Sequence, residues 1–388
     1  MIRYLCSAFA ATTMVVFCLA SPAGAWSFSE GAVAIHSNSS YGGVVPAVQV
    51  DSAGNIYACG HFKTASQSGD VDPNPAVTVS VTVTGANSSV ISKYSPSGNL
   101  LWYVVLDATG DDQISDCALN AAGDYLAVAG KFWGTMDFPG SAADITSAGD
   151  YDAYVALIST STSTTSTTAP NGVVWGKALG GTGTDQATGV DFGSSNEVYV
   201  GGHFKDEVDI NWGTGSADNQ MSAGWEDVFL TKFAVDGSLQ WSKTWGGSIN
   251  DVANDVVIDS NDIYIGGWLN GEADYDPGAG TVMIGGDGLQ GGQDSWISKF
   301  NAAGDLQWAK NFGANGHDRI EGMAAASGNV YATGYNKGFL GDWDTGPAPS
   351  NSVATTPTTR SPSSSTRPGS PSGRFPSAVR RPSKPAWA

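Results

Sequence analysis

Acidic side chains recur at fixed places in the sequence, where they could bind a cation. Four aspartates each follow a glycine-containing turn and precede a short apolar run: Asp112, Asp185, Asp251 and Asp318. Two more, Asp274 and Asp276, lie in the acidic loop DYDPGAG. Oxygen ligands suit Ca²⁺, so these residues form the candidate metal site, with Ca²⁺ as the candidate cofactor. The alternative is that each aspartate caps its own turn by accepting backbone N–H groups, and recurrence in nearly every copy favours this alternative.

Other residue patterns that could support catalysis are weak. No serine lies in a G-x-S-x-G motif, and carboxylates are so numerous that no pair stands out as a glycosidase acid and base. His61 and His203 occupy the same repeat position, which other copies fill with Lys131, Trp268 and Tyr335. Neither histidine has a partner at metal-ligand spacing, so we expect a surface or sheet-edge role. No catalytic or organic cofactor-binding residue is identified.

These residues belong to a long internal repeat. A strand-like phrase ending in glycine returns five times, and its glycines recur every 65 to 72 residues: Gly60, Gly130, Gly202, Gly267 and Gly334. Self-similarity at such a period indicates a repeat architecture. In the copy at 241–307, short runs of Val, Ile, Trp and Phe alternate with Gly, Asn and Asp turns, without a helical apolar period. Each copy therefore predicts four short strands.

Four antiparallel strands per copy, in tandem, are typical of a β-propeller. We expect an all-β chain with four complete blades and an incomplete fifth, in units at about 26–101, 102–174, 175–240, 241–307 and 308–346. A tryptophan recurs in the closing strand and is expected to pack between blades: Trp102, Trp175, Trp241 and Trp308. The recurring glycines are expected to let the next blade approach closely. Trp26–Ser29 is predicted to complete the terminal blade.

The two ends of the chain differ from the repeat domain at 26–346. Residues 1–25 have a positive start, an apolar segment and an A-x-A site ending at Ala25, as a signal peptide does. We expect cleavage near Ala25 and a secreted, periplasmic or cell-surface protein. No later segment is long and apolar enough to span a bilayer. Residues 347–388 hold nine of the 17 prolines and are predicted to be disordered. A natural flexible tail, a degenerate blade and out-of-frame sequence remain open for this end.

Charge and cysteine content limit the partners. The formal charge is −19, and residues 26–346 carry 11 basic and 37 acidic side chains. Such a body repels nucleic acid and anionic lipid, and it attracts cations or a basic partner. After the predicted cleavage two cysteines remain, Cys59 and Cys117. An exported protein can keep a disulfide, so they form either one bridge or two buried thiols. Nothing in the sequence predicts an oligomer, and we expect a monomer.

The repeat resembles the bacterial SBBP-type β-propeller repeat. The resemblance lies in G-x-x-x-D, a short apolar strand and G-N-V-Y-x-x-G, followed by D-A-F-V-x-K-(F/L)-x-x-x-G-x-L-x-W. Matching stretches are Gly181–Gly202 with Asp227–Trp241, and Gly247–Gly267 with Asp294–Trp308. The resemblance covers about residues 26–346 and implies an exported or surface protein without established catalytic residues. The first copy departs at Gly43, which replaces the aspartate, and the fifth copy departs after Gly346.

These observations favour a non-enzymatic, exported propeller that presents loops for binding a surface glycan or a protein. Long inserts such as Gly285–Gln293 are the expected contact loops. The alternative is an enzyme, either a polysaccharide-active hydrolase or lyase or a redox propeller. A cavity holding converging, unlike ionisable groups would favour the enzyme. A face of turn-capping aspartates would favour binding or scaffolding.

Overall fold

The computed structural model describes residues 43–62, 68–72, 77, 79–82, 84–140, 142–160, 172–285, 292–314, 316–337, 341–342 and 353–357. All of them belong to the compact unit Met1–Thr358. The predicted signal peptide, the strand at Trp26–Ser29, most of the contact loop at Gly285–Gln293 and residues 358–388 lie outside the described residues. The described residues form strands and turns and contain no helix. Accordingly, none of them belongs to a helix that could cross a membrane.

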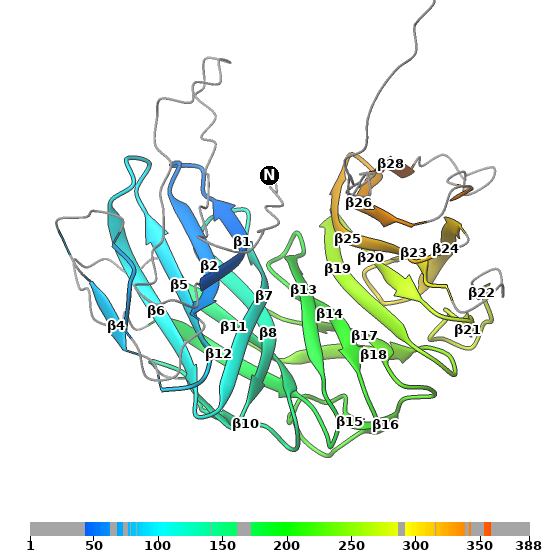
Figure 1. The fold of residues 1–388 in the computed structure, drawn as a ribbon, viewed down its shortest axis with the longest axis horizontal. Coiled ribbons are helices and arrows are strands. Elements are labelled where there is room, and N and C mark those ends of the chain that lie inside the picture. The colour runs from blue at the N-terminus through cyan, green and yellow to red at the C-terminus, as the bar shows by residue number, and fades with distance from the viewer. Residues whose placement is uncertain are drawn as a thin grey trace, which may run out of the picture. The chain divides into compact units, whose positions relative to one another are not determined.

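Four sheets of antiparallel strands follow one another along the chain, as the repeat predicts (Figure 1). In each sheet the strands pair in chain order, so that a sheet corresponds to one copy of the repeat. The first sheet contains β1 (Gly43–Val50), β2 (Ile56–Phe62), β5 (Ser88–Tyr94) and β6 (Leu100–Ala108), and the second contains β7 (Asp111–Leu119), β8 (Tyr125–Trp133), β11 (Asp152–Ser159) and β12 (Val173–Leu179). The third contains β13 (Gln186–Phe192), β14 (Val198–Phe204), β17 (Asp227–Phe233) and β18 (Leu239–Trp245), and the fourth contains β19 (Asp251–Asp259), β20 (Asp262–Leu269), β23 (Asp294–Phe300) and β24 (Leu306–Ala314).

Small hairpins lie between the second and third strands of the copies, where the sequence predicted only a looser stretch. They are β3 (Ser68–Asp70) with β4 (Ser80–Thr82), β9 (Thr135–Asp137) with β10 (Ile145–Thr146), β15 (Glu207–Asp209) with β16 (Asn219–Met221), and β21 (Glu272–Asp274) with β22 (Met283–Gly285). The β9 strand also pairs with the outer strand β6 of the preceding sheet. Likewise β27 (Gly341–Asp342) pairs with β24. These contacts cover part of an otherwise open sheet edge.

The fifth copy forms a sheet of a different kind. It contains β25 (Asp318–Ala326), β26 (Asn329–Asn336) and β28 (Val353–Pro357). The first two strands are antiparallel, whereas β28 is parallel to β26. Residues 353–357 thus depart from the disorder predicted for 347–388. In the described part of the chain, β26 has no antiparallel third strand beside it, so its backbone groups on that side can pair with β28. The one proline of β28, Pro357, is the last residue of the strand.

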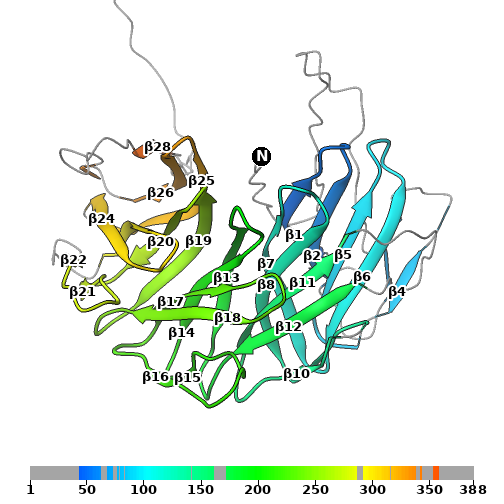
Figure 2. The same cartoon turned by 180° about the vertical axis from the view of Figure 1, so that it is seen from behind.

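The hydrophobic core lies in layers between successive sheets. The first strands are neighbours in the order β1, β7, β13, β19 and β25, and Figures 1 and 2 show the sheets side by side in chain order. One buried cluster joins the first and second sheets through Tyr57, Leu106, Val128 and Tyr154. Equivalent clusters join the second sheet to the third, the third to the fourth and the fourth to the fifth. A single sheet cannot bury both faces, so each copy is stabilised by its neighbours.

The recurring glycine has a different role from the one predicted. Each first strand contains a bulge opposite this glycine, as between Ala253 and Asp255 in β19. A Cβ atom on Gly267 would lie 2.0 Å from the backbone oxygen of Val252. The corresponding distances are 2.3 Å at Gly60, 1.9 Å at Gly130, 2.0 Å at Gly202 and 1.8 Å at Gly334. The nearest backbone therefore belongs to the same sheet rather than to the next one, because the bulge pushes a carbonyl toward the second strand.

The closing-strand tryptophans pack between sheets, as predicted, at the two copies where the partner is described. The indole Nε1 of Trp175 donates to the carbonyl of Val235 in the third sheet, at 2.9 Å. Its ring lies against Gly237, which has a φ of 81° in the turn before β18. Trp241 contacts the fourth sheet in the same way through Ala302 and Gly304. A glycine is needed at this turn both for the positive φ and for the indole above it.

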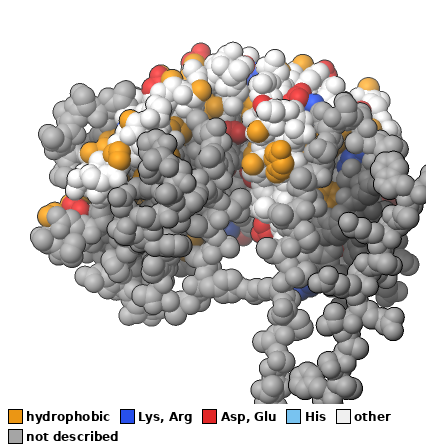
Figure 3. Space-filling model, turned by 90° about the horizontal axis from the view of Figure 1, so that it is seen from above, with side chains coloured by type: hydrophobic (Ala, Val, Ile, Leu, Met, Phe, Trp, Pro, Cys, Tyr) orange, Lys and Arg blue, Asp and Glu red, His pale blue; other side chains and the backbone are white. Residues whose placement is uncertain are grey.

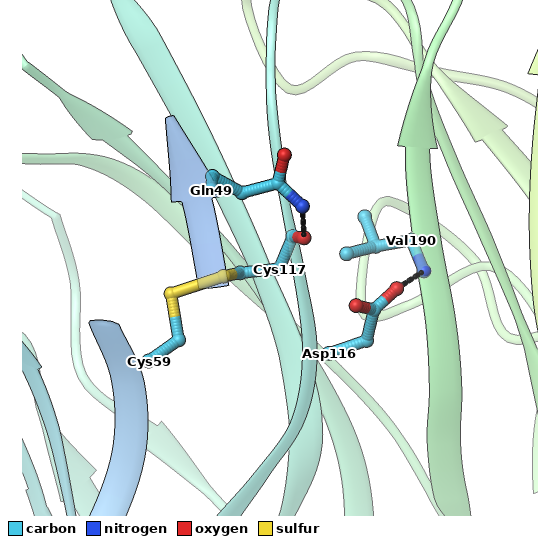
Figure 4. The surroundings of a disulfide bond; sticks show 5 residues. All are labelled: Gln49, Cys59, Asp116, Cys117 and Val190. Carbon is cyan, nitrogen blue, oxygen red and sulfur yellow. Dashed lines mark hydrogen bonds between the residues drawn. A yellow bond between two sulfur atoms is a disulfide. The ribbon is translucent and has the colours of Figure 1, made fainter. Parts of the chain in front are cut away.

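Cys59 and Cys117 form a disulfide between the first two sheets (Figure 4). Their Cα atoms are 6.5 Å apart, and 58 positions separate them in sequence. Beside the bridge, the side-chain amide of Gln49 donates to the carbonyl of Cys117 at 2.8 Å. The carboxylate of Asp116 accepts a hydrogen bond from the backbone N–H of Val190 at 3.0 Å. The first three sheets are thus connected by covalent and polar contacts as well as by apolar packing.

Replacement of the bulge-facing glycine should destabilise the protein. We expect Gly267→Ala to lower the free energy of unfolding by about 1–3 kcal/mol, because its Cβ would meet the backbone oxygen of Val252. Urea denaturation followed by tryptophan fluorescence measures the change. Gly278→Ala is the control, since its Cβ would meet only the side chain of Asp276. Equal stability of the two variants would contradict the proposed role of the bulge.

Loss of the disulfide should also lower stability. We expect Cys59→Ser with Cys117→Ser to reduce the free energy of unfolding by about 2–4 kcal/mol, because the closed loop no longer restricts the unfolded chain. Denaturation with and without reductant measures the effect. Reductant should destabilise the unmodified protein but leave the double variant unchanged. An unmodified protein that is equally stable with reductant would show that the bridge contributes nothing.

Candidate binding site

The four aspartates of the predicted cation site are buried at the starts of four different strands. Each has 0% of its surface exposed: Asp112, Asp185, Asp251 and Asp318. The carboxylate of Asp185 accepts hydrogen bonds from the backbone N–H groups of Gly181, at 3.1 Å, and Lys205, at 2.9 Å. Two others also accept from the residue four places earlier, Asp112 from Ala108 and Asp251 from Gly247. These contacts are those of turn-capping residues.

Asp274 and Asp276 also hold their own loop together. Asp274 accepts hydrogen bonds from the backbone N–H groups of Asp276, at 3.1 Å, and Val282, at 2.8 Å. Asp276 accepts one from Gly278 at 2.8 Å. Within the described part of the chain, no three His, Cys, Asp or Glu side chains are grouped so that they could hold a metal ion. In Figure 3 the visible acidic side chains are scattered rather than gathered in one patch. The calcium site therefore remains a prediction, while the hydrogen bonds support the capping alternative.

Buried aspartates from adjacent sheets stand close together. Asp152 is the first residue of β11 and interacts electrostatically with Asp185. Asp227 is the first residue of β17 and interacts electrostatically with Asp251. Oδ1 of Asp152 and Oδ1 of Asp227 are buried without a hydrogen-bond partner among the described residues. Burial raises the pKa of Asp152 to about 7. Burial, with the charge of Asp152 nearby, raises the pKa of Asp185 to about 8. Burying the negative charges of Asp152 and Asp185 away from water is costly. Protonation of these carboxyls therefore stabilises the contact between the two sheets.

The five first strands jointly line a small polar pocket of about 100 Å³. The side chains that reach it from the bulges differ from copy to copy: Ser115, Thr188, Asn254 and Glu321. Several of them also connect neighbouring sheets. The hydroxyl of Thr188 donates to the carbonyl of Ala253 at 2.8 Å, and the amide of Asn254 donates to Ile320 at 2.6 Å. The pocket has room for about three water molecules and presents hydroxyl, amide and carboxylate groups.

Six basic side chains lie over aromatic rings, and they fall into two groups. Three of them also form salt bridges: Lys93 with Asp51, Lys232 with Glu197 and Lys299 with Asp262. The other three have no carboxylate within salt-bridge distance among the described residues: Lys131 over Tyr151, Lys205 over Trp225 and Arg319 over Trp268. In a chain with a formal charge of −19, unpaired cations beside aromatic rings are candidate contacts for a ligand.

Arg319 is the most firmly held of the unpaired cations. Its guanidinium lies 4.4 Å from the ring centroid of Trp268 and 5.9 Å from that of Tyr335. Its Nε donates to the side-chain oxygen of Gln293 at 2.6 Å. Arg319 is half-buried and stands two residues before Glu321, which lines the polar pocket. We call Trp268, Gln293, Arg319 and Tyr335 the Arg319 cluster.

The repeat position after the recurring glycine contributes more than was predicted. Trp268 and Tyr335 occupy it in the fourth and fifth copies, and Lys131 occupies it in the second. Each pairs with a first strand, as Tyr335 does with Arg319. His61 is 9% exposed and His203 is half-buried, and each lies in a strand that pairs with a strand on both sides. The expected sheet-edge role is therefore wrong for both histidines, and the expected surface role is wrong for His61. The sequence signal that could have identified this position is that its residue varies between copies while the glycine before it does not.

A second and larger hollow of about 480 Å³ lies at the opposite ends of the first strands. It is lined by the ends of β7, β13, β19 and β25, including Leu119, Phe192, Ile258 and Ala325. Its acidic groups already serve the fold: Asp191 accepts the backbone N–H of Ile258 at 2.8 Å. The hollow is large enough for a small ligand, but it contains no charged group free to select one. The pocket beside the Arg319 cluster is therefore the better candidate.

Comparison with known proteins leaves the family open. No family model matches the chain. The chain is similar to a protein described as "Regulatory protein FlaEY" from Caulobacter vibrioides, with 28% identity over 228 residues. The match covers 57% of this chain and 21% of that relative. The chain thus spans about a fifth of the relative's length.

The buried aspartates predict a pH-dependent stability. The folded chain holds the proton of Asp152 up to a pKa of about 7, against an ordinary value of 3.8. This contribution to stability is therefore complete below about pH 4 and is lost as the pH rises through 7. We expect Asp152→Asn to avoid that loss. The melting temperature of the variant minus that of the unmodified protein should therefore be larger at pH 8 than at pH 4, by about 2 °C or more.

Thermal unfolding at several pH values measures this difference. Asp144→Asn is the control, because it removes an exposed carboxylate instead of a buried one. Its melting temperature should follow that of the unmodified protein at every pH. A difference between Asp152→Asn and the unmodified protein that stays constant with pH would contradict the protonation of the buried pair.

Proposed function

We propose that the chain is an SBBP-type β-propeller whose sheets are blades around a common axis. The support is that all five first strands contribute residues to one small pocket. Side-chain bonds between successive first strands also fit this arrangement, as from Thr188 to Ala253 and from Asn254 to Ile320. The fifth sheet lacks an antiparallel third strand in the described part of the chain. Closure between the fifth and first sheets belongs to this proposal.

We further propose that this propeller is an exported, non-enzymatic scaffold that binds a surface glycan or a protein. The observation that carries the proposal is the set of unpaired cations over aromatic rings: Lys131, Lys205 and Arg319. They stand on a rigid framework of sheets, and they differ in type and neighbours from copy to copy. A rigid scaffold with variable side chains at one end of its strands is suited to recognition. The aspartates that recur instead of varying are used by the fold.

The disulfide supports the exported location. Structural disulfides persist in oxidising compartments and are rare in the cytosol. The bridge between Cys59 and Cys117 therefore agrees with the signal peptide predicted at 1–25. The proposed location is the periplasm, the cell surface or the medium.

An enzyme is the second candidate, and one observation favours it. The polar pocket brings Glu321 near Arg319, and partial burial of the carboxyl raises the pKa of Glu321 while Arg319 opposes the shift. A carboxyl that stays protonated to a higher pH than usual can serve as a general acid. Against this, no second catalytic group of matching geometry is apparent among the described residues. Binding without turnover therefore remains the better proposal.

A panel of purified polysaccharides and surface proteins tests the proposal, with binding and turnover measured together. We expect saturable binding of at least one ligand, which is recovered at its original size. The double variant Lys131→Gln, Lys205→Gln should bind at least about fivefold more weakly, since each lost cationic contact contributes about 0.5–2 kcal/mol. The control is Lys232→Gln, Lys299→Gln, in which the cations removed are already paired.

Three outcomes would contradict parts of this proposal. Cleavage of a bond in the ligand by the purified protein, abolished by Glu321→Gln, would establish the enzyme instead. Failure to bind any member of the panel would remove the support for a binding scaffold. Equal loss of affinity in the two double variants would show that overall charge, rather than the unpaired cations, controls binding.

A further inference from the structure

We propose that the Arg319 cluster recognises the carboxylate of an acidic sugar, so that the ligand of the scaffold is a uronate-containing glycan. This inference rests on the proposed binding function and specifies its ligand. Arg319 is the anchor, Tyr335 is the aromatic neighbour of the sugar ring, and the polar pocket receives the hydroxyl groups. Each of these roles follows from a contact that the structure describes.

The guanidinium of Arg319 is fixed before any ligand arrives. One nitrogen, Nε, is held by Gln293 at 2.6 Å, and the guanidinium carbon lies 4.4 Å from the ring centroid of Trp268 and 5.9 Å from that of Tyr335. Trp268 is 8% exposed and Gln293 is 9% exposed, so both supports are themselves fixed by packing. The terminal N–H groups carry no salt bridge with a described residue. A guanidinium held in this way presents a planar fork that matches a carboxylate at little entropic cost.

The charge of Arg319 has no counterion in the described part of the fold, although the chain is strongly acidic. Glu321 lies in its electrostatic field, but the two side chains do not form a salt bridge. In contrast, Lys232 and Lys299 lie over tyrosines and are paired with acids 3.2 Å and 2.7 Å away. A half-buried cation that is left unpaired costs free energy. A ligand carboxylate would supply the missing partner, which explains why this cation differs from the paired ones.

The surroundings favour a sugar over other carboxylates. Glu321, two residues after Arg319 and in its electrostatic field, lines the pocket. The pocket also offers the hydroxyl of Thr188 and the amide of Asn254, and these groups can bond to sugar hydroxyls. The pocket of about 100 Å³ has room for such hydroxyls or for bridging waters. Tyr335 is partly exposed beside the guanidinium and offers a ring to the apolar face of a sugar.

The acidic body limits how such a glycan can bind. With a formal charge of −19, the protein repels a polyanion at distances beyond the contact itself. Recognition must therefore be local, through one or a few sugar units at the mouth of the pocket. Salt screens the repulsion as well as the contact. Affinity should for this reason fall far less with salt than it does for proteins that bind polyanions through basic patches.

Titration calorimetry with short defined oligosaccharides tests the inference. The probes are trigalacturonate and its fully methyl-esterified form, in which a methyl group on each carboxyl removes the charge. We expect the free acid to bind at least about tenfold more tightly, because a charge-assisted bidentate contact contributes more than a neutral one. Arg319→Gln should abolish this preference. Arg319→Lys should recover little of it, since an ammonium lacks the fork.

Two further variants separate recognition from folding. Gln293→Leu leaves the charge unchanged but releases the guanidinium, and it should weaken trigalacturonate binding about threefold or more. Lys299→Gln removes a cation that already has a partner, and it should bind like the unmodified protein. Melting temperatures within about 3 °C of the unmodified protein would show that each variant is folded. Arg319→Gln and Gln293→Leu test different contacts, so a folding defect in one leaves the other informative.

The results distinguish this inference from the function on which it rests. Equal binding of the acid and the ester, or full binding by Arg319→Gln, overturns the carboxylate role. Binding of a neutral glycan or a protein but not of trigalacturonate leaves the scaffold function intact and overturns the acidic sugar. Binding of inorganic sulfate or phosphate in preference to the uronate, lost in Arg319→Gln, overturns the sugar while keeping the anion site. Failure to bind any ligand overturns both proposals.

Discussion

Packing between successive first strands is the interaction on which the rest of this structure depends. Each sheet is too small to bury both of its faces, so it gains its core only from the sheets beside it. The first strands β1, β7, β13, β19 and β25 are neighbours, and the buried clusters lie between their sheets. Side chains on these strands, such as Asp116 and Thr188, also bond to the backbone of the next copy.

This constraint explains why so many recurring residues are structural. The recurring glycine accommodates a bulge in the first strand, the closing-strand tryptophan covers the turn of the next copy, and the recurring aspartate caps the entrance to the first strand. Each role must be filled in every copy, so the residues repeat. A binding contact has no such requirement. Under our proposal, the residues that vary at fixed positions, such as Trp268 and Arg319, are the ones that select a ligand.

Electrostatics divide the molecule in a similar way. Buried carboxylates such as Asp152 and Asp185 lie at contacts between sheets, where protonation lowers their cost. The cations Lys93, Lys232 and Lys299 are paired, whereas Arg319 is held by neutral groups and keeps its charge available. The strongly acidic composition thus conceals a cationic feature, because composition reports the sum of charges and not their placement. The proposed ligand, an acidic sugar, follows from the position of the Arg319 charge.

The sequence by itself determined the all-β class, the antiparallel four-stranded sheets and the positions of the strands, because these follow from local alternation and turn residues. It also placed the tryptophans between sheets. The tertiary structure decided the bulge opposite Gly267, the bridge between Cys59 and Cys117 and the cluster around Arg319. These depend on distances between residues about 15 to 60 positions apart, which no local pattern contains. The sequence left Arg319 unnoticed because its partners, Trp268 and Gln293, come from the preceding copy.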